Sequence, residues 1–119
     1  MKWLQARLAA FTCAFRGVVT LLRETAHARI HLLATVLVLS LAAYLELSIA
    51  DWQALILTIA LVWLAEGMNS ALEYLCDAAV PEQHPLIGKA KDVAAGAVLL
   101  CAGFAVLMAV LVFGPYVLA

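Results

Sequence analysis

Three long stretches of the chain are almost entirely apolar. They run over about residues 30–48, 52–75 and 93–116. A helix that crosses a bilayer needs about 20 predominantly apolar residues, and each stretch is close to that length. The last is the clearest, because no charged residue occurs from Val93 to Ala119. The pattern predicts an all-α protein with three transmembrane helices.

A different periodicity precedes these stretches, over about residues 2–25. At about 100° per residue, six apolar side chains share one face of a helix: Leu4, Leu8, Phe11, Phe15, Val18 and Leu22. Polar side chains gather opposite: Lys2, Gln5, Thr12, Arg16, Thr20 and Arg23. This pattern is typical of a helix that lies in the membrane interface. It predicts an N-terminal amphipathic surface helix, serving as an anchor or in lipid entry.

The composition agrees with a membrane protein and excludes several other classes. Of the 119 residues, 67% are hydrophobic and 13% are charged, whereas soluble domains are roughly half apolar and a quarter charged. A net charge of −1 provides no basic surface for nucleic acid. The three cysteines are an odd number without metal-type spacing, which favours neither disulfides nor zinc. We expect one domain over 1–119 that oligomerises, because three spans enclose a site poorly.

The basic residues predict the orientation. All seven lie either before the first span or between the second and third. Cytoplasmic loops of membrane proteins carry the excess of lysine and arginine. The N-terminus and the 78–92 loop are therefore predicted to be cytoplasmic.

Carboxylates interrupt the second apolar stretch, where each costs roughly 2.5–3.5 kcal/mol on insertion scales. Offsets of 7 and 11 residues bring Glu73 and Asp77 within about 20° of Glu66 around a helix, and Asn69 lies about 60° to one side. Polar groups stacked in this way suggest a site. Helix–helix contacts or, for Asp77, extension to the headgroups are the alternatives.

The chemistry of this stripe suits a magnesium site beside a general base. Magnesium takes one or two carboxylates and completes its shell with water and phosphates. Glu66 lies deepest and is the candidate base. Lys89 and Lys91 could hold phosphates, or could only set the orientation. His84 fits a loop or helix-cap position. Any nucleotide site here is non-standard, because no Gly-x-x-x-x-Gly-Lys-Ser/Thr loop is present.

The same residues resemble the signature of the prokaryotic diacylglycerol kinase family, which includes undecaprenol kinases of Gram-positive bacteria. The matching segments are Glu66-Gly67-Met68-Asn69-Ser70-Ala71-Leu72-Glu73, then Asp77, His84 and Gly88-Lys89-Ala90-Lys91-Asp92. The resemblance implies a small enzyme of the bacterial inner membrane with a surface helix and three spans. It also implies a homotrimer with active sites between subunits, and Mg-ATP as phosphoryl donor.

Residue roles follow from the resemblance by position. Glu66 resembles the base that takes the proton of the lipid hydroxyl, and Glu73 resembles a magnesium ligand. Asn69 resembles a polar group that orders the site, and it is grouped with the residues expected to bind the nucleotide. The other five motif positions in that group are Asp77, His84, Gly88, Lys91 and Asp92.

The sequence departs from the family at the second metal ligand. The family has a magnesium-binding glutamate shortly before an Arg-hydrophobic-His segment, which is Arg29-Ile30-His31 here. Glu24 stands seven residues before His31, one more than usual, and Thr25 occupies the expected register. Glu24 is the candidate second metal ligand, and an exposed surface carboxylate is the alternative.

These observations predict an ATP-dependent lipid kinase. Diacylglycerol is the first candidate acceptor. Undecaprenol is a close second, because Arg29-Ile30-His31 and the stretch over residues 91–98 resemble the Gram-positive branch of the family. Both acceptors offer one primary hydroxyl at the interface. A non-catalytic membrane subunit or ion relay, in which the acidic stripe conducts ions, is the alternative from another class.

Overall fold

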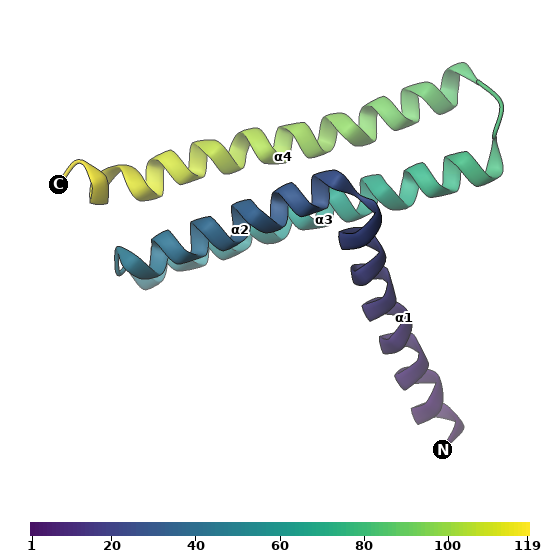
Figure 1. Ribbon diagram of the computed structural model, residues 1–119, viewed down its shortest axis with the longest axis horizontal. Coiled ribbons are helices and arrows are strands. Elements are labelled where there is room, and N and C mark those ends of the chain that lie inside the picture. The colour runs from purple at the N-terminus through teal and green to yellow at the C-terminus, as the bar shows by residue number, and fades with distance from the viewer.

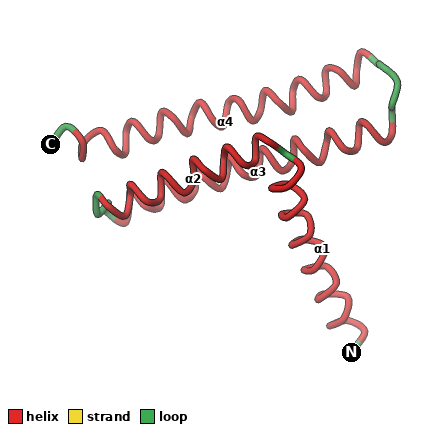
Figure 2. Tube along the Cα trace, in the orientation of Figure 1, coloured by secondary structure: helices red, strands yellow, loops and turns green.

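Four α-helices make up the protein, and a computed structural model describes all of residues 1–119. Their bounds are α1 Lys2–Glu24, α2 Ala26–Tyr44, α3 Ile49–Ala79 and α4 Pro85–Val117. The last three run alongside one another in alternating directions, and α1 leaves them at a steep angle (Figure 1). Short connections join all four helices (Figure 2). The predicted all-helical architecture, with one separate N-terminal helix, is confirmed.

The three later helices are long and apolar enough to cross a membrane. With 31 residues in α3 and 33 in α4, these helices are about 46 and 50 Å long at 1.5 Å per residue. The hydrocarbon core of a bilayer is only about 30 Å thick. Both helices are therefore longer than the hydrocarbon core is thick.

Two helices begin earlier than the apolar stretches predict, for the same reason. Helix α2 begins at Ala26 rather than near residue 30, and the predicted 78–92 loop is a short connection over residues 80–84. His84 caps α4 by accepting a hydrogen bond from the Leu86 N–H at Nδ1 (3.1 Å), and Pro85 occupies the first turn. Hydropathy marks the hydrocarbon, whereas a helix continues into the headgroups. Residues 88–92 consequently lie in the first turns of α4.

The turn between α2 and α3 is closed by a left-handed residue. Glu46 has φ 53°. Its N–H donates to the Ala43 carbonyl and the Leu47 N–H donates to the Ala42 carbonyl, both with an N···O distance of 3.3 Å. These two bonds form the Schellman arrangement that ends many helices. Leu47 packs beside Ala42 in a small buried cluster with Leu55 of α3 and residues 112–113 of α4. The turn thus fixes α2 against both neighbouring helices.

Polar groups support the same end of the bundle. Tyr116 Oη donates to Asp51 Oδ2 (2.7 Å) and accepts from the Ser48 N–H (3.1 Å). Ser48 also caps α3 through the Asp51 N–H (3.2 Å). One tyrosine on α4 therefore ties the start of α3 to the end of α4.

Replacing this hydroxyl should lower stability without affecting a site at the other end of α3. We expect Tyr116→Phe to lower the midpoint of thermal unfolding by a few degrees, since two hydrogen bonds are lost while the ring remains. Unfolding followed by circular dichroism in detergent measures the change. An unaltered midpoint would show that the tie contributes nothing.

Candidate active site

One face of α3 carries both the helix packing and the predicted polar stripe. Its buried positions lie at spacings of seven, four, three and seven residues: Leu55, Val62, Glu66, Asn69 and Cys76, with Ser70 beside them. Glu66 is fully buried. The side chains of Glu73 and Asp77 are exposed, because they lie about two and three turns nearer the end of the helix. The stripe therefore runs from the packed interior to the exposed end of α3.

The first of three relevant cavities lies where α1, α2 and α3 meet, and has a volume of about 290 Å³. We call it the carboxylate cavity. Four acidic side chains line it: Glu24, Glu66, Glu73 and Asp77. Asn69, Ser70 and Tyr74 contribute further polar groups. The structure thus brings Glu24 together with the stripe, although 42 residues separate Glu24 from Glu66 in sequence.

Hydrogen bonds position the two predicted metal ligands. Tyr74 Oη donates to Glu24 Oε2 (2.7 Å), and Asn69 Nδ2 donates to Glu73 Oε1 (3.3 Å). Glu24 is the last residue of α1, and the extended backbone of Thr25 (φ −108°, ψ 116°) separates it from α2. This break explains why a carboxylate one residue out of the expected register still lines the cavity, as does Thr25 itself.

The donor set fits magnesium. No three His, Cys, Asp or Glu side chains of the chain converge as a ready metal cage. Magnesium is bound by one or two carboxylates together with water and substrate phosphates, so two carboxylates that line one cavity meet its requirement. Glu24 and Glu73 are the residues that would hold it.

A second cavity of about 280 Å³ lies between α2, α3 and α4, and we call it the apolar cavity. Glu66, Asn69 and Glu73 line it as well, so these three side chains separate it from the carboxylate cavity. Its other walls are largely apolar and include Ile30 and Val98. Glu66, although fully buried, thus lies in the wall between a largely apolar cavity and a polar one.

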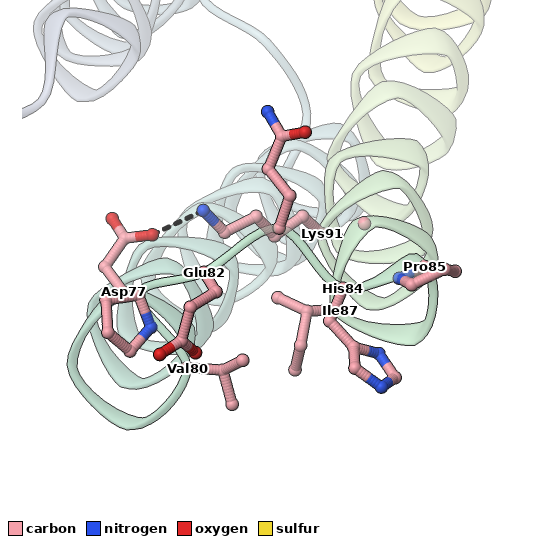
Figure 3. Close-up of a pocket in the computed structure, with 10 residues that line it drawn as sticks. Asp77, Val80, Glu82, His84, Pro85, Ile87 and Lys91 are labelled. Carbon is pink, nitrogen blue, oxygen red and sulfur yellow. Dashed lines mark hydrogen bonds and ion pairs between the residues drawn. The ribbon is translucent and has the colours of Figure 1, made fainter.

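A third cavity of about 570 Å³ lies at the connection between α3 and α4, and we call it the connection cavity (Figure 3). Asp77, His84, Gly88 and Lys91 line it, and Lys91 forms an ion pair with Asp77 across the two helices. Asp77 also lines the carboxylate cavity. Asp92 is exposed and lines none of the three cavities. Five of the six predicted nucleotide positions therefore line the carboxylate cavity or the adjoining connection cavity, and Asp92 lines neither.

Comparison with known proteins agrees with this arrangement. The sequence pattern described as "Prokaryotic diacylglycerol kinase" matches residues 12–113. The chain belongs to the prokaryotic diacylglycerol kinase family. The undecaprenol kinase of Bacillus subtilis is 34% identical over 106 residues, covering 89% of this chain and 86% of that protein.

Two relatives named diacylglycerol kinase are similarly close. The protein from Synechocystis is 39% identical over 102 residues, which cover 85% of this chain and 58% of that longer relative. The protein from Helicobacter pylori is 36% identical over 98 residues, which cover 82% of this chain and 73% of that relative. Similarity over most of the chain thus extends to relatives named for either acceptor.

Four polar side chains of this diacylglycerol kinase family member reach the site without having been singled out for it. They are His27, His31, Ser70 and Tyr74. Ser70 lies four residues after Glu66, so helical spacing alone could have placed it beside the stripe. His31 and Tyr74 face partners 35 and 50 residues away. Their contacts depend on how α2 and α1 pack against α3, which periodicity does not reveal.

Proposed function

We propose that this protein transfers the γ-phosphoryl group of Mg-ATP to the hydroxyl of a lipid alcohol in the membrane. The observation that carries the proposal is the position of Glu66. It is fully buried, neither of its carboxylate oxygens has a hydrogen-bond partner, and it lines both the apolar and the carboxylate cavities. A buried carboxylate without partners is costly and calls for a functional explanation.

Phosphoryl transfer needs alignment and charge neutralisation more than covalent chemistry. In our proposal, the acceptor hydroxyl reaches Glu66 from the apolar cavity, and Glu66 takes its proton as the oxygen attacks the γ-phosphorus of ATP and ADP leaves. Glu24 and Glu73 would hold magnesium, which would neutralise charge on the phosphates. Asn69 keeps Glu73 oriented through its hydrogen bond.

The connection cavity is the proposed nucleotide site. Asp77, His84, Gly88 and Lys91 line it, next to the carboxylates that hold the metal. Lys91 supplies the positive charge for phosphate. Asp92 follows on the same turn of α4, and we retain it as a nucleotide contact on the strength of the family motif alone.

Placement in the membrane and assembly belong to the same proposal. The basic residues lie in α1, in the first turns of α2 or near the α3–α4 connection, so this end faces the cytoplasm of a bacterial inner membrane and the C-terminus lies outside. Large apolar side chains remain exposed along all three spans, which suits contact with lipid and with further copies of the chain. We propose a single domain over 1–119 that assembles as a homotrimer.

For the acceptor we propose diacylglycerol, with undecaprenol as the second candidate. Two relatives are named diacylglycerol kinase, and the relation to an undecaprenol kinase over most of both chains favours the alternative. Purified protein in mixed micelles with Mg-ATP should be assayed side by side with each lipid. Faster turnover with undecaprenol would make undecaprenol the preferred acceptor. If neither lipid supported turnover, the kinase proposal would be wrong and the non-catalytic subunit or ion relay would remain as the alternative.

The lysine pair offers a matched test of the nucleotide site. Lys91→Met keeps most of the side chain's apolar stem but removes the charge, and we expect it to raise KM for Mg-ATP roughly tenfold. Lys89 carries the same charge two residues away and lines none of the three cavities. Lys89→Met should leave KM nearly unchanged. Equal effects of both variants on KM would mean that Lys91 does not bind the nucleotide and only contributes to the orientation in the membrane.

A further inference from the structure

A histidine on α2 lies against the buried carboxylate of the proposed base. His31 Nε2 is 3.5 Å from Glu66 Oε2, and the His31 side chain is only 18% exposed. Both oxygens of Glu66 otherwise lack a hydrogen-bond partner. Burying a carboxylate without a donor is unfavourable. The imidazole stands where such a donor is needed.

The other polar groups of the apolar cavity leave this position to His31. Asn69 directs its amide nitrogen to Glu73 rather than to Glu66. Besides Glu66 and Glu73 on α3, the titratable side chains lining this cavity are His27 and His31 on α2. From α4 the cavity receives only apolar side chains, at positions 95, 98, 99 and 102. The imidazole of His31 is the group within 4 Å of the Glu66 carboxylate that can carry a positive charge.

Trp63 packs against the His31 ring, and Thr35 links Trp63 to the backbone of His31. Thr35 Oγ1 donates to the His31 carbonyl (2.7 Å) and accepts from Trp63 Nε1 (3.0 Å). The rings of Trp63 and His31 meet edge to face, with centroids 6.4 Å apart and planes at 65°, a favourable arrangement of aromatic rings. Because Trp63 lies on α3, one turn before Glu66, the helix that carries the base also supports the imidazole.

We propose that His31 is a positioning residue for Glu66, an inference that rests on the proposed function. As an Nε2–H donor to Oε2, the imidazole holds the carboxylate so that Oε1 faces the acceptor hydroxyl. The separation of 3.5 Å exceeds an ordinary hydrogen bond. Such bonds are often long in substrate-free enzymes and shorten in the reacting complex. His31 thereby acts through Glu66 and transfers no proton to substrate itself.

Two variants of His31 separate positioning from packing. His31→Leu fills similar space without a donor, and we expect it to lower kcat about 10- to 100-fold, less than loss of the base itself. KM for Mg-ATP should stay within about twofold, because His31 does not line the connection cavity. His31→Gln restores an N–H donor and should recover part of kcat. Ser40→Leu, at an exposed position of the same helix, is the control.

A double-mutant cycle identifies Glu66 as the partner. Glu66→Asp shortens the side chain by one methylene and withdraws the carboxylate from the imidazole. In that background His31→Leu should cost only a few-fold in kcat, since the contact is already lost. Equal losses in both backgrounds, or a His31→Leu enzyme with wild-type kcat, would overturn the inference alone. A wild-type protein without lipid-dependent turnover would overturn the proposed function instead.

Discussion

Glu66→Gln is expected to lower kcat about 10²- to 10⁴-fold, the contribution typical of a general base. The amide has nearly the shape of the carboxylate but cannot accept the proton of the acceptor hydroxyl. Folding and assembly should be preserved, because the change removes a buried charge that lacks hydrogen-bond partners. The measurement is lipid-dependent ATP turnover in mixed micelles, together with size-exclusion chromatography of the detergent-solubilised protein.

The matched control is Glu46→Gln. Glu46 is an exposed carboxylate in the turn between α2 and α3, at the end of the bundle remote from the α3–α4 connection. The same chemical change there should leave kcat and the elution volume unaltered. A Glu66→Gln protein with turnover within a few-fold of wild type would remove Glu66 from the role of base.

In helix α3, the spacing of residues along the sequence was enough to predict which side chains lie on the same face. The spacing of Glu66, Asn69, Glu73 and Asp77 placed them on one face, and all four line the carboxylate cavity. Helical geometry fixes such relations within one element, whatever surrounds it. The buried end of the stripe also followed from the sequence, because apolar residues precede Glu66.

Contacts between different helices could not be predicted from the sequence in the same way. His31 faces Glu66 only because α2 packs against α3 in one particular register. Glu24 lines the carboxylate cavity because α1 ends there and Thr25 turns the chain into α2. Counting residues to the Arg-hydrophobic-His segment suggested a shift of one position, but the cavity is lined by residues 24 and 25 alike. The packing of α1 against α2 and α3 therefore places Glu24 at the cavity, although its position in the sequence is one residue away from the family motif.

The connection between α3 and α4 is shorter than the predicted 78–92 loop for a physical reason. Charged and polar residues there lower the hydropathy, so the segment resembles a loop between two spans. The His84 cap and Pro85 nevertheless start a helix that continues into the bilayer. As a result Lys91 is held on a rigid element opposite Asp77, rather than on a loose connection. A site built on helix ends fixes charge more accurately than one built on loops.

Glu73→Gln is expected to raise the magnesium concentration for half-maximal rate roughly tenfold or more, because the ion loses a charged ligand. The glutamine keeps a carbonyl oxygen that can accept the Asn69 bond, so the local geometry is retained. Glu24→Gln should act in the same direction, since its oxygen can still accept from Tyr74.

Magnesium titrations at fixed ATP and lipid test both substitutions, and Glu46→Gln again serves as the control. An unchanged titration for Glu73→Gln would exclude it as a ligand. A shift for Glu73→Gln without one for Glu24→Gln would leave Glu24 as a surface carboxylate that only anchors Tyr74. Shifts in both variants would instead support a metal held between the last residue of α1 and the polar face of α3. The surface helix would then be part of the catalytic centre as well as a membrane anchor.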